Sequence, residues 1–129
     1  MKQTVVFFTR NIRLFSRLRA ALKSSVLQKA ASFDGIKDAA RVGASAIVLH
    51  LTDENGWILL EIEEQFPSVP VYAILAPAMS IKNSDLAELA KTSGAAGVFS
   101  SKNGVNELVA ALWVRHFDLA HFGILVSKP

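Results

Sequence analysis

The sequence predicts one α/β domain built on a parallel five-stranded sheet with helices on both faces. Short apolar runs alternate with longer helical patterns five times along the 129 residues. Most of these runs lack apolar/polar alternation, and no linker or low-complexity segment separates them. Strands that alternate with helices pair in parallel through right-handed crossovers, and a strand that is apolar on both sides is covered on both sides.

The five predicted strands are rich in Val, Ile, Leu, Ala or Phe. Their boundaries are Thr4–Thr9, Val26–Ala31, Ala46–Leu51, Val71–Leu75 and Gly97–Phe99. Parallel pairing brings the carboxyl ends of such strands to one edge of the sheet, where ligands bind in folds of this class. The ends offer Thr9, His50, Leu75 and Ser100-Ser101, a set without a carboxylate for general acid–base catalysis.

Helical patterns fill the intervals and the C-terminal part. The first has Phe15, Leu18 and Leu22 on one face, and Asp34 is the expected N-cap of the second. Pro67 ends the third, which follows Asn55-Gly56. The first four helices are expected at about 11–24, at about 34–42, from after Gly56 to about Phe66, and at about 83–92. The fifth helix is expected to begin between 103 and 106 and to be the longest.

Composition is typical of a folded protein, with 51% apolar and 19% charged residues. The absence of cysteine excludes disulfides, thiolate zinc sites and cysteine nucleophiles. Neither a membrane-spanning run nor a signal peptide is present, so we expect a cytoplasmic protein without membrane contact. We expect residues 1–129 to form one domain, with 118–129 as a C-terminal extension or the start of a linker.

Three segments resemble the receiver domains of bacterial response regulators. Ser45–His50 is similar to the third strand of that family, which normally ends in the phosphoaccepting aspartate. Pro67–Ala76 is similar to the "PxxPVIxLTA" segment around the fourth strand, and Gly94–Lys102 is similar to the "GAxxYLxKP" of the fifth. The resemblance covers about residues 3–117 and implies a (βα)5 flavodoxin-like three-layer sandwich with strand order 2-1-3-4-5.

The residues that carry the chemistry of that family are replaced in this chain. His50 stands at the phosphoacceptor position, and Thr9 and Arg10 stand where the resemblance places two metal-binding acids. The degenerate switch positions are Leu75 in place of the hydroxyl residue and Ser101 in place of the lysine, with Lys102 one residue further on. The resemblance therefore implies a pseudo-receiver.

Phosphoryl transfer to a carboxylate requires a metal ion and an aimed nucleophile. Arg10 places a permanent cation where Mg²⁺ would sit, and a guanidinium does not deprotonate. We therefore expect a domain that is not phosphorylated, is not an enzyme, and binds neither a metal nor a cofactor.

Two alternatives remain open. Asp53, the acid nearest to His50, would serve as a displaced phosphoacceptor in an atypical phosphorylated receiver, although Asp53 and Glu54 also suit a turn ahead of a helix. A small-ligand-sensing domain would use the same crevice. No glycine-rich phosphate loop follows the first strand, which argues against the usual nucleotide sites.

His50 has three interpretations. We favour a hydrogen-bonded structural histidine, ahead of a pH-sensitive switch and of a histidine that takes part in chemistry. His116 and His121 are five residues apart, which is not the spacing of a metal-binding pair on a helix.

Two surfaces are candidates for contacts with other molecules. The first 33 residues hold seven basic residues and no acid, and Arg13 and Arg17 fall near one helical face with Arg10. This face is a solvated surface, a docking surface for an acidic protein or, least favoured, a nucleic-acid contact. In the last helix Leu112, Trp113 and Phe117 either fold back on the core or form an interface for a homodimer or an effector domain.

The sequence as a whole predicts a receiver-like module in two-component-type signal transduction. It would act through protein–protein contacts, with a signalling protein or an effector domain as its partner. The contacts would use the first helix or the face formed by the fourth helix, the fifth strand and the fifth helix.

Overall fold

The computed structural model describes residues 3–23, 25–52, 55–76, 88, 92, 94–100 and 104–112. Each predicted strand is present, with ends within one residue of the expected positions. The predicted fourth helix lies largely outside the described residues, and the fifth is described only as the helical segment 105–112. The elements are β1 (Gln3–Phe8), α1 (Ile12–Ala21), β2 (Ser25–Ala30), α2 (Phe33–Val42), β3 (Ala46–Leu51), α3 (Trp57–Gln65), β4 (Val71–Leu75) and β5 (Gly97–Ser100).

The strands form one parallel sheet in the order β2-β1-β3-β4-β5. This confirms the predicted fold class and strand order. The register pairs Leu51 with Leu75, so β3 and β4 end level with each other, and Phe8, the last residue of β1, pairs with Leu49 near the same edge of the sheet. This edge of the sheet is where the resemblance placed the functional residues.

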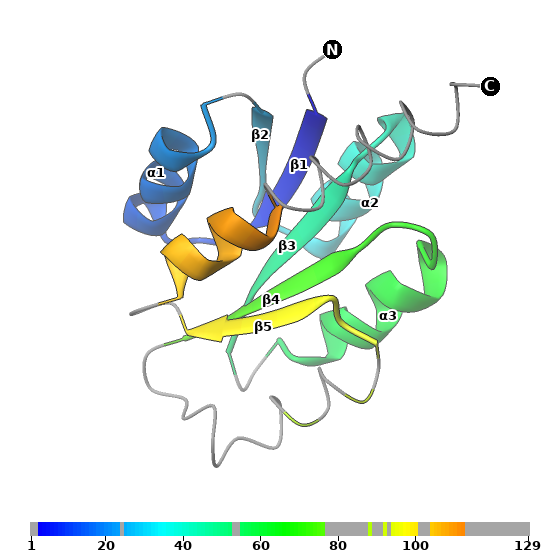
Figure 1. The fold of residues 1–129 in the computed structure, drawn as a ribbon. Coiled ribbons are helices and arrows are strands. Elements are labelled where there is room, and N and C mark those ends of the chain that lie inside the picture. Colours follow the sequence, from blue (N-terminus) through cyan, green and yellow to red (C-terminus); the bar gives the residue numbers. More distant parts are fainter. Residues whose placement is uncertain are drawn as a thin grey trace, which may run out of the picture.

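Two apolar layers enclose the sheet, because successive side chains of a strand point to opposite faces. Val6, Phe8 and Leu49 pack with α2 and α3 on one face. Val5, Phe7 and Val48 pack with α1 and the segment 105–112 on the other. Figure 1 shows the two pairs of helices on the two sides of the sheet. The continuous apolar runs of the sequence are thus explained by burial on both faces, as predicted.

The helix starts agree with the sequence except at α2. Asn11 caps α1, since its side chain accepts a hydrogen bond from the Leu14 N–H. For α2 the expected N-cap Asp34 was wrong. Ser32 is extended and its Oγ accepts from the Gly35 N–H, whereas Asp34 already lies in the first helical turn. There its carboxylate lies 3.3 Å from Lys37 Nζ.

One face of the segment 105–112 contributes to the core. Val105, Leu108 and Leu112 are buried against the face of the sheet that α1 covers. Leu112 is only 7% exposed, which removes it from the candidate interface residues. Trp113 and Phe117 lie outside the described residues. In the part of the chain that is described, no helix is both long and apolar enough to cross a membrane.

Candidate functional site

Thr9 and His50 meet at the carboxyl ends of β1 and β3. Thr9 Oγ1 lies 2.9 Å from His50 Nδ1. The register explains this contact, since Phe8 pairs with Leu49 and the next residue of each strand points to the opposite face. The side chains that replace an expected acid and the expected phosphoacceptor are therefore bonded to each other.

The hydrogen bonds of Thr9 favour one tautomer of His50. The Thr9 hydroxyl is buried, with 1% of the residue exposed, and its oxygen already accepts from the Asn11 N–H at 3.0 Å. Among the described residues, His50 Nδ1 is the acceptor that its hydrogen reaches. With the Thr9 hydroxyl as the donor to Nδ1, the neutral ring carries its proton on Nε2.

The His50 ring is held in its neutral form. Burial removes water from the imidazole and lowers the pKa of His50 below its ordinary value of 6.5. Nε2 is buried and has no hydrogen-bond partner among the described residues. Protonation would place a charge in this half-buried position, so the structure favours a neutral, hydrogen-bonded histidine.

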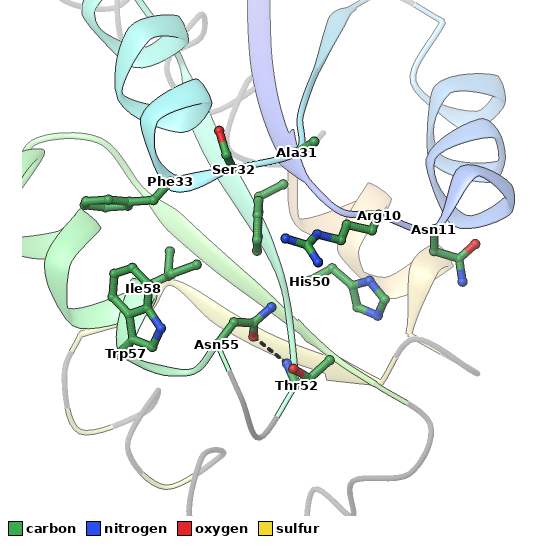
Figure 2. A pocket seen from close by; sticks show the side chains of 11 residues that line it. Arg10, Asn11, Ala31, Ser32, Phe33, His50, Thr52, Asn55, Trp57 and Ile58 are labelled. Carbon is green, nitrogen blue, oxygen red and sulfur yellow. Dashed lines mark hydrogen bonds between the residues drawn. The ribbon is translucent and has the colours of Figure 1, made fainter.

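Arg10 lies on the opposite side of the strand ends from the Thr9–His50 contact (Figure 2). It lines a cavity of about 760 Å³ between the ends of β1 and β3 and the starts of α2 and α3. In Figure 2 its guanidinium points toward the part of the cavity formed by Phe33, Asn55 and Trp57, and the His50 ring points the opposite way. The lining residues are Phe8, Arg10, Asn11, Ala31, Ser32, Phe33, His50, Thr52, Asn55, Trp57 and Ile58.

Among the lining residues that the structure describes, Arg10 carries the permanent charge. Arg10 is exposed, and no carboxylate of the described residues forms an ion pair with it. Asp53 and Glu54 fall between the lining residues Thr52 and Asn55 in the sequence but lie outside the described residues. The described part of the chain contains no group of three His, Asp or Glu side chains that would hold a metal ion.

Thr52, Asn55 and two aromatic rings form a further part of the cavity wall. Asn55 Oδ1 accepts from the Thr52 N–H at 2.7 Å, which links the residue after β3 to a residue just before α3. The Phe33 and Trp57 rings lie edge to face, with centroids 5.3 Å apart. Lys37 Nζ lies 4.6 Å from the Phe33 ring centroid on α2. Trp57 remains 53% exposed.

The other candidate residues do not join this site. Leu75 is fully buried in the apolar layer that α2 and α3 cover, on the opposite face of the sheet from the Thr9–His50 contact. Ser101 and Lys102 lie outside the described residues. Arg13 and Arg17 are exposed on α1 and do not line the cavity.

Sequence reasoning did not single out Phe33, Asn55 or Trp57 for this site. Phe33 follows β2, whereas Asn55 and Trp57 both follow β3, and only the fold brings them to one cavity with Arg10. One signal was present in the sequence, because Trp57 directly follows the Asn55-Gly56 turn beyond the third strand. A large aromatic residue near a strand's carboxyl end is a candidate for the wall of a binding site.

Comparison with known proteins identifies the fold. The sequence matches no family model and no curated protein. The signal receiver domain of a LuxO repressor protein from Vibrio parahaemolyticus matches with a TM-score of 0.74 and 19% identity over 100% of both chains. The CheY-like protein TadZ from Pseudomonas aeruginosa matches with a TM-score of 0.70 and 20% identity, over 86% of this chain and 97% of that one.

A longer protein matches over the same fold. NtrX from Brucella abortus has a TM-score of 0.71 and 17% identity, and the match covers 99% of this chain but 29% of NtrX. This chain therefore has the fold of response-regulator receiver domains, and it spans less than a third of the length of NtrX.

Proposed function

We propose that this chain is a receiver-like signalling domain that does not undergo phosphorylation and acts by binding other proteins. The receiver fold supports the signalling role. The Thr9–His50 hydrogen bond carries the rest of the proposal, because it joins two positions where a phosphorylated receiver has carboxylates. A neutral imidazole and a threonine hydroxyl bind Mg²⁺ poorly, since this ion prefers charged oxygen ligands.

Arg10 opposes metal binding at the same edge of the sheet. Its permanent charge repels a divalent cation, and no carboxylate of the described residues compensates for it. Because Thr9, Arg10 and His50 replace the phosphorylation site, the domain would stay in its unphosphorylated state. It would then be regulated through the partners that it binds. Catalysis plays no part in this function.

A beryllofluoride titration tests the proposal. Beryllofluoride with Mg²⁺ mimics a phosphoryl group on an aspartate, so the amide signals of β3 are followed by NMR. We expect no shifts at Leu49, His50 or Leu51. Clear shifts that disappear in Asp53→Asn would instead establish the atypical receiver that uses Asp53 as its acceptor.

The docking surface that we propose is the solvent face of α1. Leu14 and Leu18 bury the inner face of this helix, while Arg13 and Arg17 are exposed and have no ion-pair partner among the described residues. Two cations one helical turn apart suit an acidic protein surface.

Charge reversal tests this surface. Arg13→Glu combined with Arg17→Glu should abolish capture of a partner that the unmodified domain retains, and binding should weaken as salt rises. Lys23→Glu combined with Lys29→Glu changes the net charge equally at other exposed positions and should leave capture intact. Equal loss with both pairs would show a general charge effect and contradict an α1 site.

A further inference from the structure

The cavity beside Arg10 has the size and composition of a binding site for a small molecule. Its volume of about 760 Å³ falls in the range of ligand pockets, which is roughly 300–1,000 Å³. Phe8 and Ile58 are 5% and 4% exposed and form part of its apolar wall. A cavity with apolar walls and few polar groups is the usual form of such a site.

The polar groups of the cavity are mainly hydrogen-bond donors. Backbone N–H groups already engage the oxygens of Ser32 and Asn55, which leaves the hydroxyl hydrogen and the amide NH₂ to be donated. Arg10 adds a guanidinium with five N–H donors and a permanent positive charge. His50 contributes no negative charge, and none of the lining residues that the structure describes is acidic. Hydrogen-bond donors beside a permanent positive charge favour a ligand that is an anion.

The aromatic side of the cavity selects a planar group. Lys37 covers the Phe33 ring, and the Phe33 ring meets Trp57 at 67°. Trp57 is 53% exposed although it lines the cavity, so much of the indole is open to a ligand. Aromatic rings are stabilised by an offset or edge-to-face neighbour beyond the burial of their area.

We propose that this cavity binds a small organic anion in which a carboxylate or phosphate is joined to a planar ring. Arg10 would bind the anionic group, with Asn55 and Ser32 as further donors, and Trp57 would pack against the ring. A guanidinium binds both kinds of anion with two parallel hydrogen bonds. The site goes beyond docking through α1, and its test uses neither Mg²⁺ nor a protein partner.

Titration with simple probes tests the two parts of the ligand separately. Phenyl phosphate and benzoate carry both a ring and an anion, inorganic phosphate carries the anion alone, and benzyl alcohol carries the ring alone. Binding is followed by amide NMR shifts of residues around the cavity. In a Trp113→Phe background, the fluorescence of Trp57 gives a second signal.

We expect saturable binding of phenyl phosphate or benzoate at least tenfold tighter than that of inorganic phosphate or benzyl alcohol. The tighter of the two ring anions identifies the anionic group. No saturable shift around the cavity with either ring anion would overturn the proposal. Equal binding of benzyl alcohol and benzoate would also overturn it, because the charge would then play no part.

Variants place the binding at the named side chains. Arg10→Gln removes the cation at an exposed position and should weaken binding at least tenfold. Arg13→Gln makes the same change in charge on α1, outside the cavity, and should leave binding unchanged. Trp57→Leu should weaken binding of the ring anions and leave that of inorganic phosphate unchanged. Equal effects of Arg10→Gln and Arg13→Gln would contradict the site.

Discussion

Thr9 Oγ1 lies 2.9 Å from His50 Nδ1, and this hydrogen bond ties the carboxyl end of β1 to that of β3. Thr9 also accepts from the Asn11 N–H, and Asn11 in turn caps α1. The replaced positions thus form a connected polar network at the edge of the sheet.

Thr9→Val should destabilise the domain. The substitution keeps the volume but leaves His50 Nδ1 and the Asn11 N–H without their partner, at a cost of about 1–3 kcal/mol for a buried unsatisfied group. Urea unfolding measures the change in the free energy of unfolding. Thr4→Val, at a half-buried position of the same strand, is the control and should change stability by less than about 0.5 kcal/mol. A similar small effect at Thr9 would show that the hydrogen bond contributes little.

Stability should fall as the pH is lowered through the histidine range. Burial lowers the pKa of His50 in the folded state, so the unfolded chain binds this proton more readily. The stability is therefore fully present above pH 6.5 and is lost as the pH falls from 6.5 toward the lowered pKa. Urea unfolding at several pH values should show this dependence.

Substitution assigns the pH effect to one histidine. His50→Asn should reduce the loss of stability below pH 6.5. A protein with both His116→Gln and His121→Gln retains His50 and should keep the dependence of the original chain. If the double variant removes the dependence and His50→Asn does not, the assignment to His50 is wrong.

Mg²⁺ should not stabilise the unmodified domain. Arg10 and the neutral Thr9–His50 pair offer no carboxylate, so thermal unfolding should be the same with and without millimolar Mg²⁺. The combination of Thr9→Asp, Arg10→Asp and His50→Asp restores three acids at one edge of the sheet. Its melting temperature should rise with Mg²⁺ concentration, since a ligand that binds the folded state stabilises it. Stabilisation of the unmodified domain by Mg²⁺ would contradict the proposed loss of the metal site.

Gly104→Ala should destabilise the start of the segment 105–112. A Cβ at Gly104 would lie 2.5 Å from the Ser100 carbonyl oxygen and 2.7 Å from Phe99 Cβ. The Gly104 N–H also donates to that oxygen at 2.6 Å, so the two backbones cannot move apart freely. We expect a loss of about 1–3 kcal/mol in thermal or urea unfolding.

Gly56→Ala is the matched control for this substitution. Gly56 has φ −59° and ψ −26°, a conformation that alanine adopts readily. The free energy of unfolding of the Gly56→Ala variant should stay the same or rise by about 0.4–1 kcal/mol, because alanine reduces the conformational entropy of the unfolded chain. Equal losses at both positions would show that close packing at Gly104 is not the cause.

Sequence periodicity predicted the sheet well because the strands are apolar on both sides. The ends of Ala46–Leu51 and Val71–Leu75 were predicted without error, and both strands lie in the interior of the sheet. Helix ends were harder, as α2 shows. Ser32 and Asp34 are both good capping residues, and only the extended backbone at Ser32 decides between them.

The resemblance located the candidate site but not the directions of its side chains. It grouped Thr9, Arg10, His50 and Leu75 at one pocket. In the structure Thr9 contacts His50, Arg10 lines a cavity beside α2 and α3, and Leu75 is buried in the core. Neighbouring residues of a strand point to opposite faces of the sheet, so side chains that are adjacent in the sequence lie in different surroundings.

The sequence by itself determined the alternation of strands and helices, the burial of the sheet on both faces, and the absence of acids at positions 9, 10 and 50. These properties depend on residue type and on the spacing of apolar residues, both of which can be read from one sequence. The tertiary structure alone decided that Thr9 bonds to His50 and that Arg10 shares a cavity with Trp57. Those contacts depend on the register of β1 against β3 and on the paths of separate loops, which bring together side chains far apart in the sequence.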